Sequence, residues 1–97
     1  MMFSKQIYLT REVADKVPVE IQLLMLNMIE ELKVKKDYLQ VFQLKEQGQQ
    51  MLEIKHKQEI PKFTQTILIK NIGVKKEMKI YVIDSGDYST MMFSHEY

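Results

Sequence analysis

The 97-residue sequence has no cysteine, three glycines, two prolines and a single arginine. Without cysteine there is no disulfide, thiolate metal site or cysteine nucleophile, so packing alone must stabilise the fold. Arg11 by itself cannot supply the bidentate guanidinium contacts that commonly recognise phosphates and bases. The apolar stretch Val19–Ile29 is interrupted by Glu20, Gln22 and Asn27, and it is too short to cross a membrane.

Charge and composition indicate an ordinary globular domain. Thirteen lysines and one arginine against thirteen acidic residues give a net charge of +1, too balanced to favour nucleic acid or an anionic membrane as partner. The start of the chain lacks the apolar core of a signal peptide, which favours a cytoplasmic location. With 45% hydrophobic and 28% charged residues and no internal repeat, we expect residues 1–97 to form a single domain around one core.

Residues 18–36 are predicted to form one long helix, because Pro18 is typical of a first helical turn. On the helical wheel one side carries the residues expected to face the core: Ile21, Leu24, Met25, Met28, Ile29 and Leu32. Val19, Leu23 and Leu26 form a second apolar strip on the far side. This strip is either covered by a terminal segment or is an interface for a protein partner or a second copy of the chain.

Four strand-like runs follow, with connections short enough for hairpins: Tyr38–Glu46, Gln49–Ile60, Phe63–Lys70 and Lys76–Asp84. A two-residue turn at Gln47-Gly48 pairs Val41 with Ile54, and two further turns continue the series. These registers place one apolar set on a common face: Leu39, Val41, Leu52, Ile54, Ile67, Ile69, Ile80 and Val82.

We therefore predict an α+β fold, an antiparallel meander of four to five strands with one long helix packed across one face. Residues 3–10 alternate as a short strand and would join the sheet at an edge or in its centre. Thr10 ends that strand and can cap a short helical turn that begins at Arg11. The last stretch, from Asp84 onward, would fold back onto the sheet.

The same registers bring polar residues together at one end of the core face. Asp37, Gln58 and Asp84 meet there, with His56 one step inward and Tyr88 beside them. Such a group could bind a ligand, satisfy buried backbone groups or hold a proton-transfer pair. A small enzyme using His56 with Asp37 or Asp84 is therefore one alternative. No standard catalytic or cofactor motif is present, however, and we expect no catalytic residue, no metal and no cofactor.

The opposite face of the predicted sheet is expected to carry lysines among larger side chains: Lys55, Lys57, Lys70 and Lys79 with Phe42, Thr66, Leu68 and Tyr81. Proteins that bind single-stranded nucleic acid use this combination for backbone contact and base stacking. Glu53 and Glu77 dilute the charge. Nucleic-acid binding is therefore kept as an alternative that the overall composition does not favour.

Three stretches carry a family resemblance: DYLQVF at 37–42, HKQEIP at 56–61 and IDSGDYSTMM at 83–92, together with Tyr8-Leu9-Thr10 and Pro18. They resemble the domain-of-unknown-function family numbered 960, small proteins of Gram-positive bacteria found in staphylococcal mobile chromosome cassettes and phage-like gene clusters. The resemblance implies a role in mobile elements but no particular activity.

Eight methionines, whose flexible side chains suit adaptable interfaces, add to the case for contacts with another protein. We predict a small non-enzymatic protein-interaction module that binds a protein partner or forms a homodimer. It would be an accessory or inhibitor protein of a mobile element, acting on a host protein or on one that the element encodes.

Overall fold

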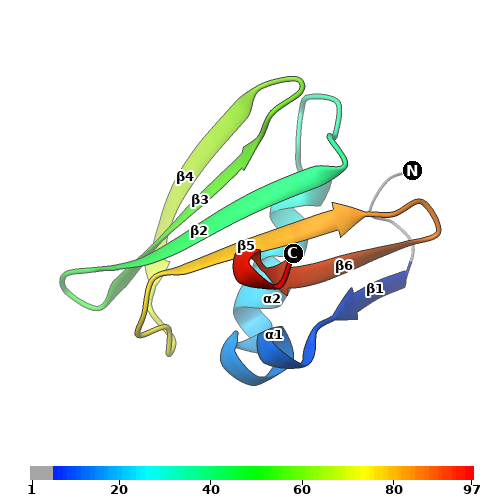
Figure 1. Ribbon diagram of the computed structural model, residues 1–97. Coiled ribbons are helices and arrows are strands. Elements are labelled where there is room, and N and C mark those ends of the chain that lie inside the picture. Colours follow the sequence, from blue (N-terminus) through cyan, green and yellow to red (C-terminus); the bar gives the residue numbers. More distant parts are fainter. Residues whose placement is uncertain (1–5) are drawn as a thin grey trace.

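Most of the molecule is one mixed β-sheet, and its longest helix crosses one face of that sheet (Figure 1). The computed structural model describes residues 6–97, in which six strands lie in the order β1-β6-β5-β2-β3-β4. The strands are β1 (Gln6–Leu9), β2 (Leu39–Gln47), β3 (Met51–Gln58), β4 (Phe63–Lys70), β5 (Met78–Asp84) and β6 (Tyr88–Phe93). The helical elements are α1 (Arg11–Lys16), α2 (Val19–Glu30) and the 3-10 turn η1 (Ser94–Glu96).

Both helices begin where the sequence predicts, and the second ends sooner than predicted. The Thr10 hydroxyl accepts the backbone N–H of Val13 at 3.2 Å, so the predicted cap of α1 is confirmed. The second helix starts directly after Pro18 and stops at Glu30, whereas the prediction extended it to Lys36. The prediction of one long helix is therefore wrong. Residues 31–38 instead form the connection to β2.

The core lies between α2 and the face of the sheet that it covers. The helix contributes Ile21, Met25, Met28 and Ile29, which are buried, while Leu24 and Leu32 are half-buried against them. The sheet contributes a second buried set: Phe42, Leu44, Leu52, Ile54, Ile80, Val82, Met91 and Phe93. Ile67 and Ile69 of β4 are half-buried at its margin. Leu52, Ile54, Ile80 and Val82 thus lie on the predicted core face.

The hairpin between β2 and β3 differs from the predicted one. Gln47 pairs with Met51 across three loop residues, and Gln49 and Gln50 take left-handed conformations with φ of 63° and 61°. Ile54 consequently lies opposite Leu44 and not Val41. The pairing is thus shifted by three residues along β2. Because side chains alternate along a strand, a shift by an odd number of residues exchanges the two faces of β2. Leu39 and Val41 face away from the core, and the prediction of their position is wrong.

The last predicted hairpin is absent from residues 6–97, since β5 pairs with β2 and leaves β4 at the edge of the sheet. The connection between β4 and β5 runs past the ends of β3 and β2. Asn71 shapes it, because its side-chain oxygen accepts the N–H groups of Gly73 and Val74 while its amide donates to the Val74 carbonyl. Val74 is thereby buried in the core, and burial of this side chain holds the connection across the open end of the sheet.

The C-terminal stretch folds back onto the sheet, as predicted, and does so as a full strand. β6 pairs antiparallel with β5 and parallel with β1, which makes the sheet mixed. β1 therefore lies at an edge; residues 3–5 of the predicted first strand fall outside the described part of the chain. The predicted fold class, four to five antiparallel strands with one long helix, is contradicted by a six-stranded mixed sheet with two short helices.

Neither α1 nor α2 is long and apolar enough to span a membrane, and no other helix of residues 6–97 is.

Candidate binding site on the open face of the sheet

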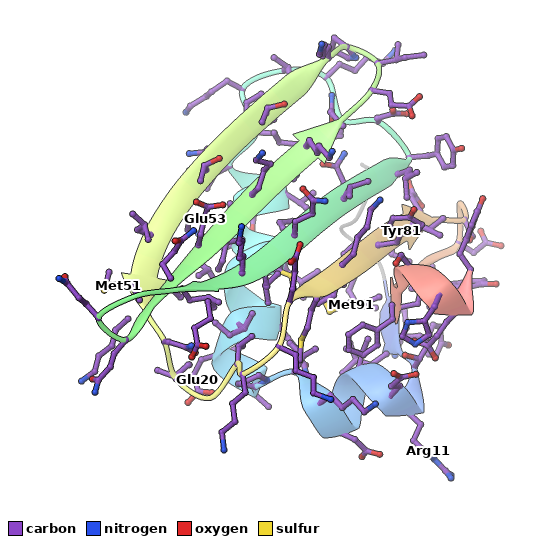
Figure 2. All side chains as sticks on the ribbon, turned by 60° about the vertical axis from the view of Figure 1, so that its left-hand side comes forward. Arg11, Glu20, Met51, Glu53, Tyr81 and Met91 are labelled. Carbon is purple, nitrogen blue, oxygen red and sulfur yellow. The ribbon has the colours of Figure 1, made fainter. Side chains whose placement is uncertain are left out.

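The face of the sheet that points away from α2 is here called the open face (Figure 2). Among residues 6–97 no helix covers β2, β3 or β4 on this face, and only the 3-10 turn η1 lies against it, at β5. The reversed β2 places Leu39 and Val41 on this face, where both are half-buried. Tyr81 of β5 lies beside them, because it pairs with Val41. The open face therefore has an aliphatic and aromatic centre, which the predicted register had assigned to the core.

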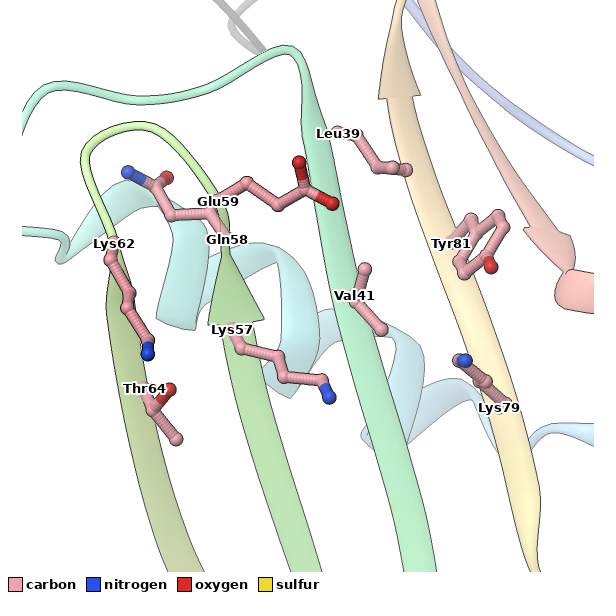
Figure 3. A pocket seen from close by; sticks show the side chains of 9 residues that line it. All are labelled: Leu39, Val41, Lys57, Gln58, Glu59, Lys62, Thr64, Lys79 and Tyr81. Carbon is pink, nitrogen blue, oxygen red and sulfur yellow. The ribbon is translucent and has the colours of Figure 1, made fainter.

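A pocket of about 360 Å³ lies on the open face over the ends of β2 and β3 (Figure 3). Its lining, here called the lysine pocket, consists of Leu39, Val41, Lys57, Gln58, Glu59, Lys62, Thr64, Lys79 and Tyr81. Leu39 and Val41 lie between the lysines of β3 and β5 and form the floor (Figure 3). The pocket is thus apolar at its base and polar at its rim.

The rim of the lysine pocket is positively charged. Lys57, Lys62 and Lys79 stand against one carboxylate, that of Glu59, so three positive charges meet one negative charge. Within residues 6–97 none of the three lysines forms an ion pair. The Lys79 ammonium lies 5.9 Å from the centre of the Tyr81 ring, a cation–π contact that leaves its charge uncompensated. This arrangement favours an anionic ligand.

A buried hydrogen-bonded network lies on the other side of the same strands. We call it the glutamine–histidine network; it consists of Asp37, Gln40, His56 and Gln58. The Gln40 amide donates to the Gln58 side-chain oxygen at 2.7 Å and to the Asp37 carbonyl at 2.9 Å. The same Gln58 oxygen accepts the Asp37 N–H at 3.0 Å. His56 Nε2 lies 2.6 Å from the side-chain oxygen of Gln40.

The network fixes the protonation of His56. Because the Gln40 amide nitrogen donates to a carbonyl, the remaining Gln40 oxygen must be an acceptor, and His56 Nε2 must donate to it. His56 is buried, stacked on Phe42 at 4.4 Å, and its Nδ1 has no partner among the described residues. Burial lowers the pKa of His56 from 6.5 to about 4, so the ring is neutral.

The network also positions one wall of the lysine pocket. Gln58 donates to the carbonyls of Lys35 and Pro61, each at 2.8 Å, and the Asp37 carboxylate accepts the Ile60 N–H at 3.1 Å. These bonds hold the turn between β3 and β4, residues 59–62, to the start of β2. Glu59 and Lys62 are therefore carried on a turn that is tied down at several points.

The structure brings together three of the five polar residues predicted from sequence. Asp37, His56 and Gln58 share the network, whereas the side chains of Asp84 and Tyr88 lie apart from it. The Asp84 carboxylate accepts the Gly86 N–H at 2.9 Å and shapes the turn before β6. Tyr88 is exposed and packs edge-on against the ring of Tyr8.

Sequence reasoning missed Gln40, because the wrong register placed it on the open face. The acids near His56 also do not reach it: His56 bonds to an amide, and the Asp37 carboxylate bonds to backbone N–H groups. Within residues 6–97 no three histidine or acidic side chains come together as metal ligands.

The other predicted surfaces are partly rearranged. Val19 and Leu23 of the far helix strip are each 61% exposed, but Leu26 is half-buried against the core. On the lysine-bearing face, Lys57 and Lys79 line the pocket with Tyr81. Phe42 is fully buried on the opposite side, so its predicted place among the lysines is wrong.

Comparison with known proteins places the chain in a family. No curated protein matches it. A crystal structure of a protein of unknown function from Enterococcus faecalis is similar to this chain, with a TM-score of 0.88 over all of this chain and 96% of that one, and it shares the fold at 17% identity. The model of the family described as "Staphylococcal protein of unknown function (DUF960)" matches residues 6–96. Since that match spans nearly the whole sequence, the chain belongs to the DUF960 family.

Proposed function

We propose that the protein is a non-enzymatic interaction module that binds an acidic segment of a protein partner in the lysine pocket. The observation that carries this proposal is the set of three lysines, free of ion pairs within residues 6–97, around an aliphatic floor. An apolar side chain flanked by aspartate or glutamate would bury itself on the floor while its neighbours meet the ammonium groups.

The pocket suits a peptide better than a nucleic acid. Stacking of bases needs an accessible aromatic face. Tyr81 is half-buried, with the Lys79 ammonium near its ring and the Tyr97 ring edge-on at 5.6 Å. Leu39 and Val41 offer no stacking surface. We therefore take single-stranded nucleic acid as an outcome for the binding experiment to test.

The biological setting of this binding is also a proposal. The resemblance to proteins of mobile chromosome cassettes supports an accessory or inhibitor role toward an acidic protein. Val19 and Leu23, on the far side of α2, provide a second exposed contact for such a partner. They lie on the opposite layer from the lysine pocket, so the two surfaces can be tested separately.

Binding of a fluorescent peptide of alternating glutamate and leucine tests the pocket. We expect the double change Lys57→Gln and Lys79→Gln to weaken binding about tenfold or more, a loss of about 1.4 kcal/mol, because two unpaired charges at the rim are removed. Binding should also weaken as salt rises. Fluorescence anisotropy at two salt concentrations measures both effects.

The matched control is the double variant Lys45→Gln and Lys55→Gln. These two lysines lie on β2 and β3 but do not line the pocket. The control removes the same net charge and should leave peptide affinity nearly unchanged. Equal losses in the two double variants would mean that attraction is general and the pocket is not the site. Tighter binding of an oligothymidine than of the peptide would favour the nucleic-acid alternative.

A further inference from the structure

Strand β4 lies at the edge of the sheet and has a row of backbone groups without partners among residues 6–97. The N–H of Asn71 donates to the Gln50 carbonyl at 2.8 Å, in the same register as the pairs of β3 and β4. Bonded and non-bonded pairs alternate along antiparallel strands, so the odd-numbered residues of β4 bond to β3. The N–H and C=O groups of the even-numbered residues therefore point outward: Thr64, Thr66, Leu68 and Lys70.

This edge lacks the features that normally prevent pairing. Natural proteins protect free edges with proline, a bulge, a charged side chain or a covering segment. β4 has neither proline nor charge from Phe63 to Ile69, and its register with β3 is continuous over eight pairs. Leu68 is 58% exposed. No described strand lies beyond β4. The edge is long, regular and apolar enough to accept another strand.

We propose that the occupant of this edge is β4 of a second copy, paired antiparallel about a two-fold axis at Ile67. In that register Thr66 pairs with Leu68 and Thr64 with Lys70 of the second copy, which gives roughly eight new backbone hydrogen bonds. A shift of the register in one direction would set Lys62 opposite Lys70, and a shift in the other loses a bonded pair. Repulsion between lysines disfavours the first shift and the lost hydrogen bonds disfavour the second, so the register centred at Ile67 is selected.

Side chains support the same pairing. Ile67 meets Ile67 of the second copy on the helix-bearing face, and Gln65 meets Ile69, in the non-bonded pairs whose side chains approach closest. Ile67 and Ile69 are half-buried in one copy, so the second copy would complete their burial. The remaining outer edge, β1, has four residues. The two-fold pairing thus gives a closed dimer with a continuous sheet.

The proposed dimer does not depend on the proposed peptide ligand, but it would change the lysine pocket. Thr64 lines the lysine pocket. In the selected register Lys70 of the second copy lies opposite Thr64 on the open face, so it adds one more ammonium group to each pocket.

Light scattering after size exclusion and amide hydrogen exchange test the pairing together. We expect the wild-type chain to have twice the 11.6 kDa monomer mass at micromolar concentration. We also expect protection of the amides of Thr64, Thr66 and Leu68, which have no partner within the described part of one copy. A monomer at hundreds of micromolar would overturn the proposal, and so would a dimer in which these three amides exchange freely.

Variants of Thr66 test whether the dimer forms through the edge of β4. Thr66→Pro removes an outward N–H and no bond to β3, so it should give a folded monomer, whereas Thr66→Val keeps the N–H and should remain a dimer. If Thr66→Pro fails to fold, Thr66→Lys serves in its place. It sets lysines diagonal to each other and to Lys70 of the second copy, and should weaken the dimer about tenfold, with partial rescue by salt. A dimer unaffected by Thr66→Lys would contradict the proposed interface.

Discussion

His56 is a neutral ring whose two nitrogens have different surroundings. Nε2 donates to Gln40, whereas Nδ1 has no partner among residues 6–97. A second proton would have to sit on Nδ1, as a buried charge with no acceptor. Phe42 and Phe63 surround the ring, at 4.4 and 5.6 Å between centres. Burial of the ring among these apolar groups lowers the pKa of His56 to about 4.

The low pKa of His56 predicts that acid destabilises the fold. The unfolded chain takes up a proton near pH 6.5, but the folded chain does so only near pH 4. The stabilisation is complete above about pH 6.5 and is lost progressively as the pH falls toward 4, by about 3 kcal/mol in all. Urea unfolding at a series of pH values measures it.

Two variants isolate the contribution of His56 to this pH dependence. His56→Gln keeps a donor near Gln40 and removes the titrating ring, so the stability of this variant should change less between pH 6.5 and 5. His95→Gln removes the other histidine, which is exposed and contacts Glu12, and serves as the control for the loss of a histidine as such. If both variants retain the wild-type slope, other groups cause the loss.

At the scale of single elements, the predicted far strip of helix α2 contains both exposed and half-buried residues. Leu23 is exposed, while Leu26 packs against the core from the same predicted strip. We expect Leu23→Ser to change the free energy of unfolding by less than about 0.5 kcal/mol, and Leu26→Ser to cost about 1–3 kcal/mol. Thermal melts of the two variants measure this difference. A large loss in Leu23→Ser would mean that Leu23 is covered by something in solution.

The β2–β3 hairpin shows which part of an element the sequence predicts. Both strands were found, because their residues alternate and favour extended backbone. The register was not, because it depends on whether the loop has two residues or three. The prediction placed Gly48 in a two-residue turn, yet the residues that adopt the left-handed conformation are Gln49 and Gln50. Because the loop has one residue more than predicted, Leu39 and Val41 lie on the open face, and the sequence did not predict the lysine pocket.

At the scale of the whole molecule, the core composition was more predictable than the strand order. Four of the six predicted helix residues and four of the eight predicted sheet residues are buried, because apolar periodicity reports burial directly. The order of strands depends on distant contacts, such as Val74 in the core and β6 between β1 and β5. The candidate site was predictable only in part for the same reason: Asp37, His56 and Gln58 were found, while Gln40 and the pocket floor required the true topology.

Thr10 joins the two ends of the described chain. Its hydroxyl caps α1 and donates to the Glu96 carboxylate at 2.8 Å, and that carboxylate also accepts the Phe93 N–H. We expect Thr10→Val to cost about 1–2 kcal/mol in the free energy of unfolding, measured by denaturant titration, because both contacts are lost. Thr10→Ser keeps the hydroxyl and should cost much less. Equal costs would show that the methyl group, and not the hydroxyl, stabilises this junction.

The parallel pairing of β1 with β6 has a consequence for how the chain is made. Ribosomes release a protein from its N-terminus, so residues 6–9 emerge long before residues 88–91, with which they pair. During that interval β1 lacks the one described strand with which it pairs. β2, β3 and β4 can meanwhile pair with close neighbours in sequence. Of the six described strands, β1 is thus made first, yet it can enter the sheet only once β6 is present.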